Sequence, residues 1–254
     1  MAGSLNSDQI RAFEERGCLF PVDVLTEEEA WEYCSAFEAY QAEYRRRIAQ
    51  RPPADPEDWL VFPHLRHGWA FDLVTHPRIA DAIESILGAD VMIWDAKLFP
   101  KPARSTSYVS WHQDATYMPM EPLEQVVTAW IALSDSTAAN GAMQFSPGTH
   151  KLGQQAHVKT YAEQNLLSYG QEIQGPRPAE EIVDVELRPG QMSIHHMHLI
   201  HGSPPNPSDR PRIGISVNYL TPAVVDHAEK KRPALLLRGR DRYGHFQSFS
   251  RPAA

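Results

Sequence analysis

A histidine and an aspartate stand two positions apart near the middle of the chain, in the stretch Ser-Trp-His-Gln-Asp that ends at Asp114. Side chains at positions i and i+2 of a strand project from the same face, so His112 and Asp114 can reach one ion while Gln113 faces away. The chain contains 12 histidines, and chance alone predicts roughly one such triplet in a chain of this composition. The pair therefore indicates a metal site only if the chain supplies a third ligand.

A histidine-rich stretch nearer the C-terminus offers four candidates for that ligand: His195, His196, His198 and His201. Strand alternation places His195 and His201 on one face, and His196 and His198 on the other. Two histidines and one carboxylate on one side of an ion leave the opposite side open, which is the arrangement of non-haem iron(II) oxygenases. The alternation alone does not decide which histidine is the third ligand.

The segment that follows, from Arg212 to Leu220, alternates between polar and apolar residues. Arg212, Gly214, Ser216 and Asn218 share one face, and the residues between them are apolar. An arginine that points into a barrel can hold a carboxylate through two parallel, charge-assisted hydrogen bonds. This polar row therefore favours a ligand that places a carboxylate deep in the pocket.

The first third of the chain is predicted to be helical. Ser7 is the expected cap of a first helix. Thr26 with Glu29 has the form of a capping box and predicts a longer helix over residues 27–48. The segment 76–88 has one apolar helical face, so it is expected to form a helix that ends at its glycine. These helices must lie against whatever structure the rest of the chain forms.

After residue 88 the pattern changes to short apolar runs separated by Gly, Pro, Asn and Ser. Such a pattern predicts an antiparallel sandwich or barrel, which can bring distant strands together at its mouth. We expect a mainly β fold with flanking helices, formed by a single domain over residues 1–254. Within it we expect a helical N-terminal region (1–88), a β core (89–222) and a C-terminal lid or tail (223–254).

The bulk composition excludes several classes of partner. The 254 residues carry a net charge of −8, which argues against nucleic acid, since binding to its backbone requires a basic surface. The polar N-terminus lacks the apolar core of a signal peptide, and no apolar run is long enough to span a membrane. Two cysteines are too few for a disulfide framework. We therefore expect a cytoplasmic protein with a small-molecule substrate; the oligomeric state is not readable from these features.

Several further motifs occur in a fixed order. They are Trp-His-Gln-Asp at 111–114, Thr-Ala-Trp-Ile-Ala-Leu at 128–133, Asn-Gly at 140–141, Ser-Pro-Gly-Thr-His at 146–150, Arg-Pro-Gly at 188–190, and His201-Gly202-Ser203 followed by Asn206, Ser208 and Arg212. Together they make the sequence resemble the phytanoyl-CoA dioxygenase-like family of iron(II)/2-oxoglutarate oxygenases. The resemblance is specific from residue 95 to residue 219 and extends in outline over residues 7–250.

The resemblance implies a double-stranded β-helix, the cupin-like jelly roll, in which His112, Asp114 and His201 are the catalytic residues and hold iron(II). His198 or His196 is the next candidate for the third ligand if the strand register differs from the expected one. The three ligands would bring iron(II), 2-oxoglutarate and O2 together.

The resemblance further implies a set of co-substrate contacts. Arg212 is expected to bind the distal carboxylate of 2-oxoglutarate, helped by Ser203 and Trp130, and Lys97 or Thr128 is expected to contribute. Trp130 as an ordinary core residue is the competing interpretation, because aromatic side chains fill barrels in any case.

Five polar or aromatic residues are candidates for contact with the substrate. They are Tyr108, Tyr117, His64, Arg66 and Asn218. A CoA thioester, the substrate in the family's name, would require a basic groove for its phosphates, which the acidic composition disfavours.

The implied reaction is the hydroxylation of an unactivated C–H bond of a small-molecule metabolite, with release of succinate and CO2. Related halogenases carry a small residue in place of the carboxylate ligand, so Asp114 favours hydroxylation over halogenation. Desaturation, cyclisation and epimerisation use the same ligands and remain alternatives. A catalytically silent cupin-like module that binds a metal or ligand is the competing class. A zinc hydrolase is weaker, because it gives no reason for an inward arginine at position 212.

Overall fold

The computed structural model describes residues 4–50, 58–167, 170–174 and 181–252. The helices are α1 (Ser7–Arg16), α2 (Glu27–Gln50), α3 (Gly68–Val74) and α4 (Pro77–Leu87). The strands are β1 (Cys18–Asp23), β2 (Val91–Leu98), β3 (Val109–His112), β4 (Met120–Glu121), β5 (Val126–Ala132), β6 (Met143–Ser146), β7 (His157–Lys159), β8 (Gln171–Ile173), β9 (Val183–Val185), β10 (Gln191–His196), β11 (Ile200–Ser203), β12 (Gly214–Leu220), β13 (Val225–Asp226), β14 (Pro233–Arg238) and β15 (Gln247–Ser248). Short 3-10 helices include η2 (Pro63–Leu65) and η3 (Asp114–Tyr117).

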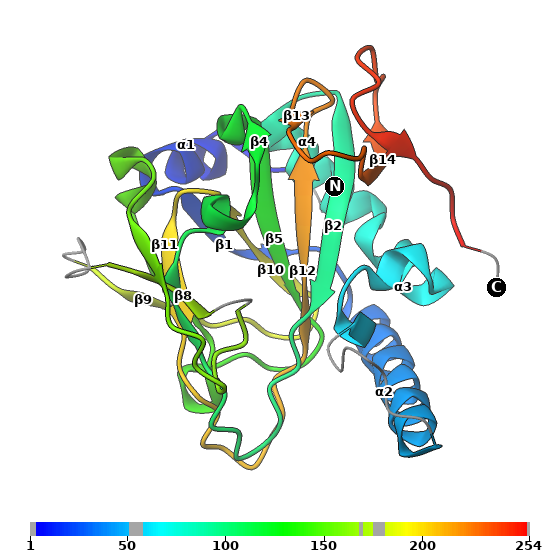
Figure 1. Cartoon of the computed structure of the whole chain (residues 1–254), viewed down its shortest axis with the longest axis vertical. Helices are drawn as coiled ribbons and strands as arrows, with labels where there is room; N and C mark the ends of the chain where they lie inside the picture. Colours follow the sequence, from blue (N-terminus) through cyan, green and yellow to red (C-terminus); the bar gives the residue numbers. More distant parts are fainter. Residues whose placement is uncertain (1–3, 51–57, 168–169, 175–180, 253–254) are drawn as a thin grey trace.

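Two sheets face each other and form the jelly roll. The major sheet has the strand order β1-β10-β5-β12-β2-β14-β15, and the minor sheet has the order β3-β11-β6-β9. Neighbouring strands in both sheets are antiparallel, apart from the parallel pair β14 and β15. Figure 1 shows the major sheet in the middle of the molecule with β9 and β11 on one side of it. The mainly β, double-stranded β-helix fold predicted from the sequence is confirmed.

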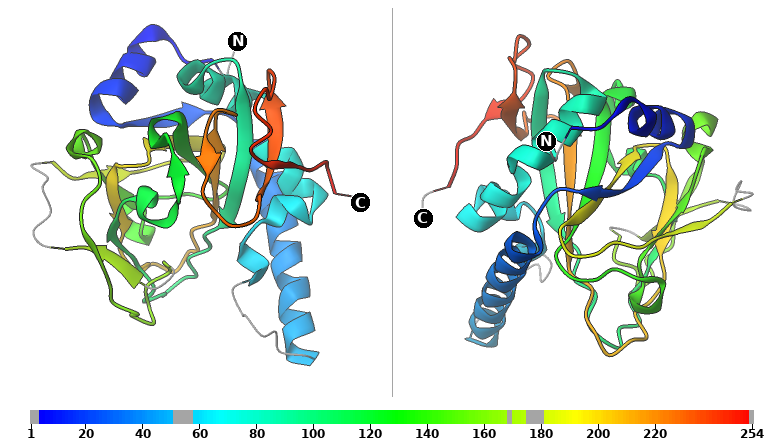
Figure 2. Two further views of the ribbon diagram at one scale, coloured as in Figure 1. Left: turned by 45° about the horizontal axis from the view of Figure 1, so that its top comes forward. Right: turned by 180° about the vertical axis from the view of Figure 1, so that it is seen from behind.

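The helices cover the outer face of the major sheet. Helices α2, α3 and α4 lie on the side of this sheet away from the minor sheet, as both views in Figure 2 also show. Buried side chains of these helices, such as Phe37 and Ile79, share one apolar core with Val217 and Tyr219 of β12. The apolar face of β12 therefore packs under the helices, and its polar face is left to point between the two sheets, as the alternation predicts.

The helix starts agree closely with the sequence prediction. The cap of α1 is Asn6 rather than Ser7, since Asn6 Oδ1 accepts hydrogen bonds from the backbone N–H groups of Asp8 and Gln9. The capping box of α2 is present: Thr26 Oγ1 accepts from the Glu29 N–H at 3.1 Å, and Glu29 Oε2 accepts from the Thr26 N–H at 2.7 Å. The first residue of each of these two helices is thus fixed by local hydrogen bonds.

Two segments outside the expected β core add strands to the major sheet. Strand β1, within the region expected to be helical, pairs with β10 and forms one edge of the sheet. It contains Pro21, which an edge strand tolerates because one side of it needs no ladder hydrogen bonds. Strand β14, from the C-terminal tail, pairs with β2 on the other side. No helix in the described part of the chain is long and apolar enough to cross a membrane.

Candidate active site

His112 and Asp114 lie together at the mouth of the jelly roll. Strand β3 ends at His112, Gln113 keeps an extended backbone (φ −118°, ψ 134°), and Asp114 is the first residue of η3. The alternation of side chains therefore continues one residue beyond the strand, and His112 Nε2 lies 3.2 Å from Asp114 Oδ1. The two side chains meet as the i, i+2 spacing predicts.

Gln113 points away from the site and fixes the segment from behind. Its Nε2 donates to the backbone carbonyls of His198 at 2.7 Å and Gly153 at 2.9 Å, and its Oε1 accepts from the Gln155 N–H at 2.7 Å. The side chain is completely buried, so these bonds are shielded from water. Gln113 thus holds the turn that carries Asp114.

His201 joins the pair from the neighbouring strand. Strand β11 pairs with β3 so that His201 lies directly opposite His112, and His201 Nε2 is 3.5 Å from Asp114 Oδ1. Ligand atoms of all three residues lie within 4.8 Å of one another. The rings of His196 and His198 instead lie beside each other, and that of His196 also lies beside His150.

His112 and His201 are both held in the tautomer that leaves Nε2 free to bind a metal. The Nδ1 atom of His112 lies 2.9 Å from the carbonyl of Ser110, and that of His201 lies 3.0 Å from the carbonyl of Leu199. A carbonyl only accepts, so Nδ1 carries the proton in each ring and the Nε2 lone pair is directed towards Asp114. The backbone therefore prepares both rings to act as ligands.

The spacing and protonation of the three donors fit a divalent metal. Donors about 2.1 Å from one ion and at right angles to each other lie roughly 3 Å apart, close to the separations found here. Burial, followed by the neighbouring His112, holds the pKa of His201 well below its usual value. Burial raises the pKa of Asp114, but the surrounding histidines, His201 foremost, more than offset this and hold it well below its usual value. A neutral imidazole and a carboxylate are the metal-binding forms of these groups.

The second oxygen of Asp114 has its own partners. Thr128 Oγ1 donates to Asp114 Oδ2 at 2.7 Å, and Asn218 Nδ2 donates to Thr128 Oγ1 at 2.9 Å. Thr128 lies on β5 with His195 and Asn218 as its cross-strand neighbours on β10 and β12. Side chains from three neighbouring strands therefore support Oδ2 of the carboxylate, directly or through Thr128, and Oδ1 is left for an ion. Thr128, which the sequence suggested as a co-substrate contact, lies against Asp114.

His195, expected from the sequence to be a packed or hydrogen-bonded strand residue rather than a metal ligand, lies against Asp114. Its Nε2 lies 3.1 Å from Asp114 Oδ2, and its ring lies between those of Phe145, at 5.1 Å, and His201, at 4.5 Å. The face that His195 shares with His201 in the alternation was the available signal. The alternation shows which way the His195 side chain points, but it does not show that the Asp114 carboxylate lies opposite it.

Beyond the triad lies a cavity of about 70 Å³ with Arg212 in its wall. The Arg212 guanidinium is buried, donates from Nη1 to the Gly141 carbonyl at 2.7 Å and lies 5.1 Å from the Trp130 ring. Its Nη1 is also 3.3 Å from Ser203 Oγ. Its Nε has no hydrogen-bond partner among the described residues. A buried arginine that lines a cavity and has an unused donor fits a carboxylate ligand.

Lys101 is a second buried basic side chain near this cavity, and the sequence reasoning missed it. Its ammonium group contacts Ser203 Oγ and the Pro204 carbonyl, and lies 3.3 Å from the Gly141 carbonyl. Burial and then the charge of Arg212 lower the pKa of Lys101 to about 6. The residue follows β2 in a Pro-Lys-Pro segment that resembles an exposed loop, and only the bridge between Lys101 and Arg212 reveals its place.

A second cavity, of about 210 Å³, adjoins the first at Asp114. Both cavities share four lining residues: Phe99, Asp114, Leu167 and Ser216. The larger cavity is also lined by Asp95, Lys97, Tyr117 and Asn218, together with apolar residues. Lys97, suggested from the sequence as a co-substrate contact, therefore lies in this second cavity and not beside Arg212.

The substrate candidates separate into two groups. Tyr117 and Asn218 line the second cavity, and the Tyr117 ring lies 6.0 Å from that of His112. Tyr108 lines a different surface pocket. His64 is fully buried against Phe249, and Arg66 is partly exposed and donates to the Val61 carbonyl. Tyr108, His64 and Arg66 are therefore not among the residues that line the two cavities beside Asp114.

A jelly roll that presents two histidines and an aspartate at its mouth defines the class of cupin-like non-haem metal oxygenases. The family model described as Phytanoyl-CoA dioxygenase (PhyH) matches residues 13–214. The chain belongs to this family.

Two curated relatives and one solved structure illustrate the relationship. The chain is 30% identical over 166 residues to 1-deoxypentalenic acid 11-beta-hydroxylase of Streptomyces arenae, with 61% of this chain and 56% of that protein covered. It is 29% identical over 189 residues to the probable alpha-ketoglutarate-dependent hypophosphite dioxygenase of Stutzerimonas stutzeri, with 73% and 61% covered. The chain therefore spans little more than half the length of these relatives. The apo structure of the non-heme monooxygenase ThoJ is 35% identical, with a TM-score of 0.83, and 96% of this chain and 88% of that one are covered.

Proposed function

We propose that this protein is an iron(II)- and 2-oxoglutarate-dependent dioxygenase that hydroxylates an unactivated C–H bond of a small-molecule metabolite. The observation that carries the proposal is the pairing of two features on adjoining walls of one cavity: a His-Asp-His cluster and a buried arginine with a free Nε donor. A metal-binding module without catalysis needs the first feature but has no use for the second. A zinc hydrolase likewise has no use for a buried carboxylate clamp.

In this proposal each residue has a defined task. His112, Asp114 and His201 hold the metal, and Arg212 binds the distal carboxylate of 2-oxoglutarate with Ser203 beside it. With O2, the bound iron and co-substrate supply oxidative decarboxylation to succinate and CO2, coupled to oxidation of a C–H bond.

The neighbours of these residues orient them and exclude water. Trp130 covers one face of the Arg212 guanidinium and keeps it dry, which strengthens its interaction with a carboxylate. Thr128 orients Asp114 through its second oxygen. Burial lowers the pKa of Arg212 to about 10, so it stays charged at neutral pH.

The presence of Asp114 favours hydroxylation over halogenation, because a carboxylate in this position leaves no ligand site for a halide. A relative named as a hydroxylase and another named as alpha-ketoglutarate-dependent support the same chemistry. The two free cysteines support action in the reducing cytoplasm. We further propose that residues 1–254 act as a single oxygenase domain.

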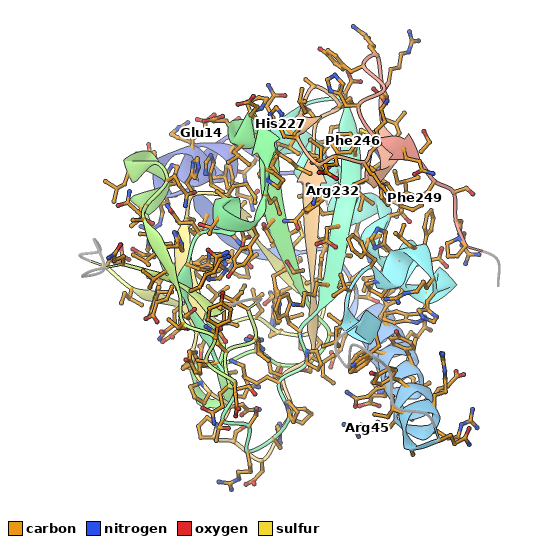
Figure 3. All side chains as sticks on the ribbon, in the orientation of Figure 1. Glu14, Arg45, His227, Arg232, Phe246 and Phe249 are labelled. Atoms are coloured by element: carbon orange, nitrogen blue, oxygen red, sulfur yellow. The ribbon has the colours of Figure 1, made fainter. Side chains whose placement is uncertain are left out.

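The test is formation of succinate from 2-oxoglutarate by the iron-loaded protein in air. We expect turnover that requires iron(II), rises with substrate, and falls at least 100-fold in His112→Ala. The matched control is His227→Gln, since His227 is an exposed histidine directly after β13 (Figure 3). Equal turnover by His112→Ala and wild type would contradict the proposal.

A further inference from the structure

Two opposite charges lie unpaired on one wall of the second cavity. Asp95 and Lys97 are two positions apart on β2 and both line this cavity. Asp95 Oδ1 is buried from solvent and has no hydrogen-bond partner among the described residues. No ion pair within 4.0 Å joins Asp95 to Lys97, whose ammonium group instead lies 5.0 Å from the ring of Phe99. Both residues therefore line the cavity without forming an ion pair with each other.

An unpaired carboxylate in a desolvated place is costly for the fold. Burial raises the pKa of Asp95 to about 6, although the charge of Lys97 and the Ala96 N–H oppose the rise. Buried polar groups without partners are rare in native proteins, and those that occur commonly belong to functional sites. A partner supplied by a ligand would remove this cost.

Apart from Lys97, one further cation among the described residues acts on Asp95. Arg232 is the further charge that acts on Asp95, but its guanidinium donates from Nη2 to Asp226 Oδ1 at 2.8 Å and lies 4.3 Å from the Trp94 ring. Figure 3 places Arg232 beside β14, towards the C-terminal tail. Arg232 is thus already paired with Asp226, while Asp95 lines the cavity with an Oδ1 that has no hydrogen-bond partner among the described residues.

We propose that the second cavity binds a zwitterionic group of the substrate, with its positively charged nitrogen on Asp95 and its carboxylate on Lys97. This inference rests on the proposed dioxygenase function and assigns the substrate to the chemical class of amino acids. The apolar residues Val61, Met118 and Leu167 line the remaining wall and suit the hydrocarbon part of such a molecule. Because Asp114 lines both cavities, that hydrocarbon part lies next to the metal centre.

Other substrate classes complement this wall less well. A neutral hydrocarbon substrate would leave both Asp95 and Lys97 desolvated without partners. A purely anionic substrate would meet Lys97 but would be repelled by Asp95. A zwitterion satisfies both charges at once.

The experiment uses the full chain loaded with iron(II) and 2-oxoglutarate. The probes are the twenty common free amino acids, each compared with its N-acetyl derivative, which lacks the ammonium charge, and its C-terminal amide, which lacks the carboxylate. Binding is followed without oxygen by the change in the visible charge-transfer band, and turnover in air is followed by succinate. We expect at least one free amino acid to raise turnover tenfold or more, and both blocked derivatives to lose that effect.

Variants separate the two charges. Asp95→Asn should weaken binding of the active amino acid at least tenfold but should not weaken binding of its N-acetyl form, which carries no ammonium group for Asp95 to hold. Lys97→Met should likewise weaken binding of the free amino acid but not of its amide, which carries no carboxylate. Asp209→Asn, which alters an exposed aspartate, is the matched control. Two results would overturn the zwitterion proposal alone, provided that 2-oxoglutarate binds normally. One is that no free amino acid is preferred over its blocked forms, and the other is that Asp95→Asn binds the active amino acid with the affinity of wild type. Failure to bind 2-oxoglutarate would instead contradict the dioxygenase function, and the zwitterion proposal with it.

Discussion

His195 Nε2 lies 3.1 Å from Asp114 Oδ2, whereas His112 and His201 both lie closest to the other carboxylate oxygen, Oδ1. The two oxygens of Asp114 therefore have separate partners: two histidine rings at Oδ1, and His195 with Thr128 at Oδ2. A carboxylate held in this way presents one oxygen to a metal, and its orientation is set before the metal arrives. The consequences can be measured on the metal-binding step itself.

Replacing His195 should weaken metal binding without removing a ligand. We expect His195→Phe to lower the affinity for iron(II) roughly tenfold, because Asp114 loses a donor that orients it. His195→Gln, which keeps an N–H donor, should recover part of the loss. Metal affinity is measured by competition with a chromophoric chelator. Equal affinity in His195→Phe and wild type would show that His195 only packs against Phe145.

The hydroxyl of Thr128 should matter more than its methyl group. Thr128→Val keeps the shape of the side chain but removes the bond to Asp114 and leaves the Asn218 amide without its acceptor. We expect iron(II) affinity to fall about tenfold in Thr128→Val and to stay within about twofold of wild type in Thr128→Ser. The same loss in both variants would mean that packing, not the hydrogen bond, sets the affinity.

The geometry of Arg212 should matter as well as its charge. Arg212→Lys keeps a cation but loses the planar fork and its contact with Trp130. We expect the Kd for 2-oxoglutarate to rise roughly 30-fold, while iron(II) affinity stays unchanged because Arg212 contacts no metal ligand. Anaerobic calorimetry measures the iron(II) affinity on the metal-free protein and the Kd for 2-oxoglutarate on the iron-loaded protein. An unchanged Kd would remove Arg212 from the co-substrate site.

Lys101 should make 2-oxoglutarate binding depend on pH. Its pKa of about 6 in the free protein leaves it mostly uncharged at pH 7.5, and a carboxylate bound near Ser203 and Arg212 would raise that pKa. Binding then takes up a proton, so affinity should fall as pH rises above 6, by at most about tenfold per pH unit.

The control for this pH dependence is a comparison of two lysine variants. Lys101→Met should have a flatter profile of Kd against pH between pH 6 and 9 than wild type, and Lys151→Met, which alters an exposed lysine, should match wild type. Parallel profiles for Lys101→Met and wild type would assign the pH dependence to other groups.

Local patterns were sufficient to predict a mainly β sandwich or barrel and the meeting of His112 with Asp114, whereas the jelly roll itself was implied by the family resemblance. Alternation in β12 predicted which of its faces is apolar, and the extended backbone at Gln113 preserved the i, i+2 relationship beyond the end of β3. Both are properties of neighbouring residues, which periodicity records directly.

Contacts between distant segments could not be predicted in the same way. Strand β1 exists because β10 provides an edge for it, and its Pro21 disfavours a strand when the segment is considered alone. Lys101 is buried only because its segment bridges to Arg212, and Asp95 is notable only because its Oδ1 has no hydrogen-bond partner among the described residues. Each depends on what surrounds a side chain in three dimensions, and a single sequence does not contain that information.

The most direct test of the account is an anaerobic titration of 2-oxoglutarate into the iron(II)-loaded protein, followed in the visible spectrum. The account predicts a metal-to-ligand charge-transfer band that saturates at one equivalent, is absent in His201→Ala, and requires a much higher 2-oxoglutarate concentration in Arg212→Lys. A wild-type protein that binds iron(II) but develops no such band at saturating 2-oxoglutarate would contradict it.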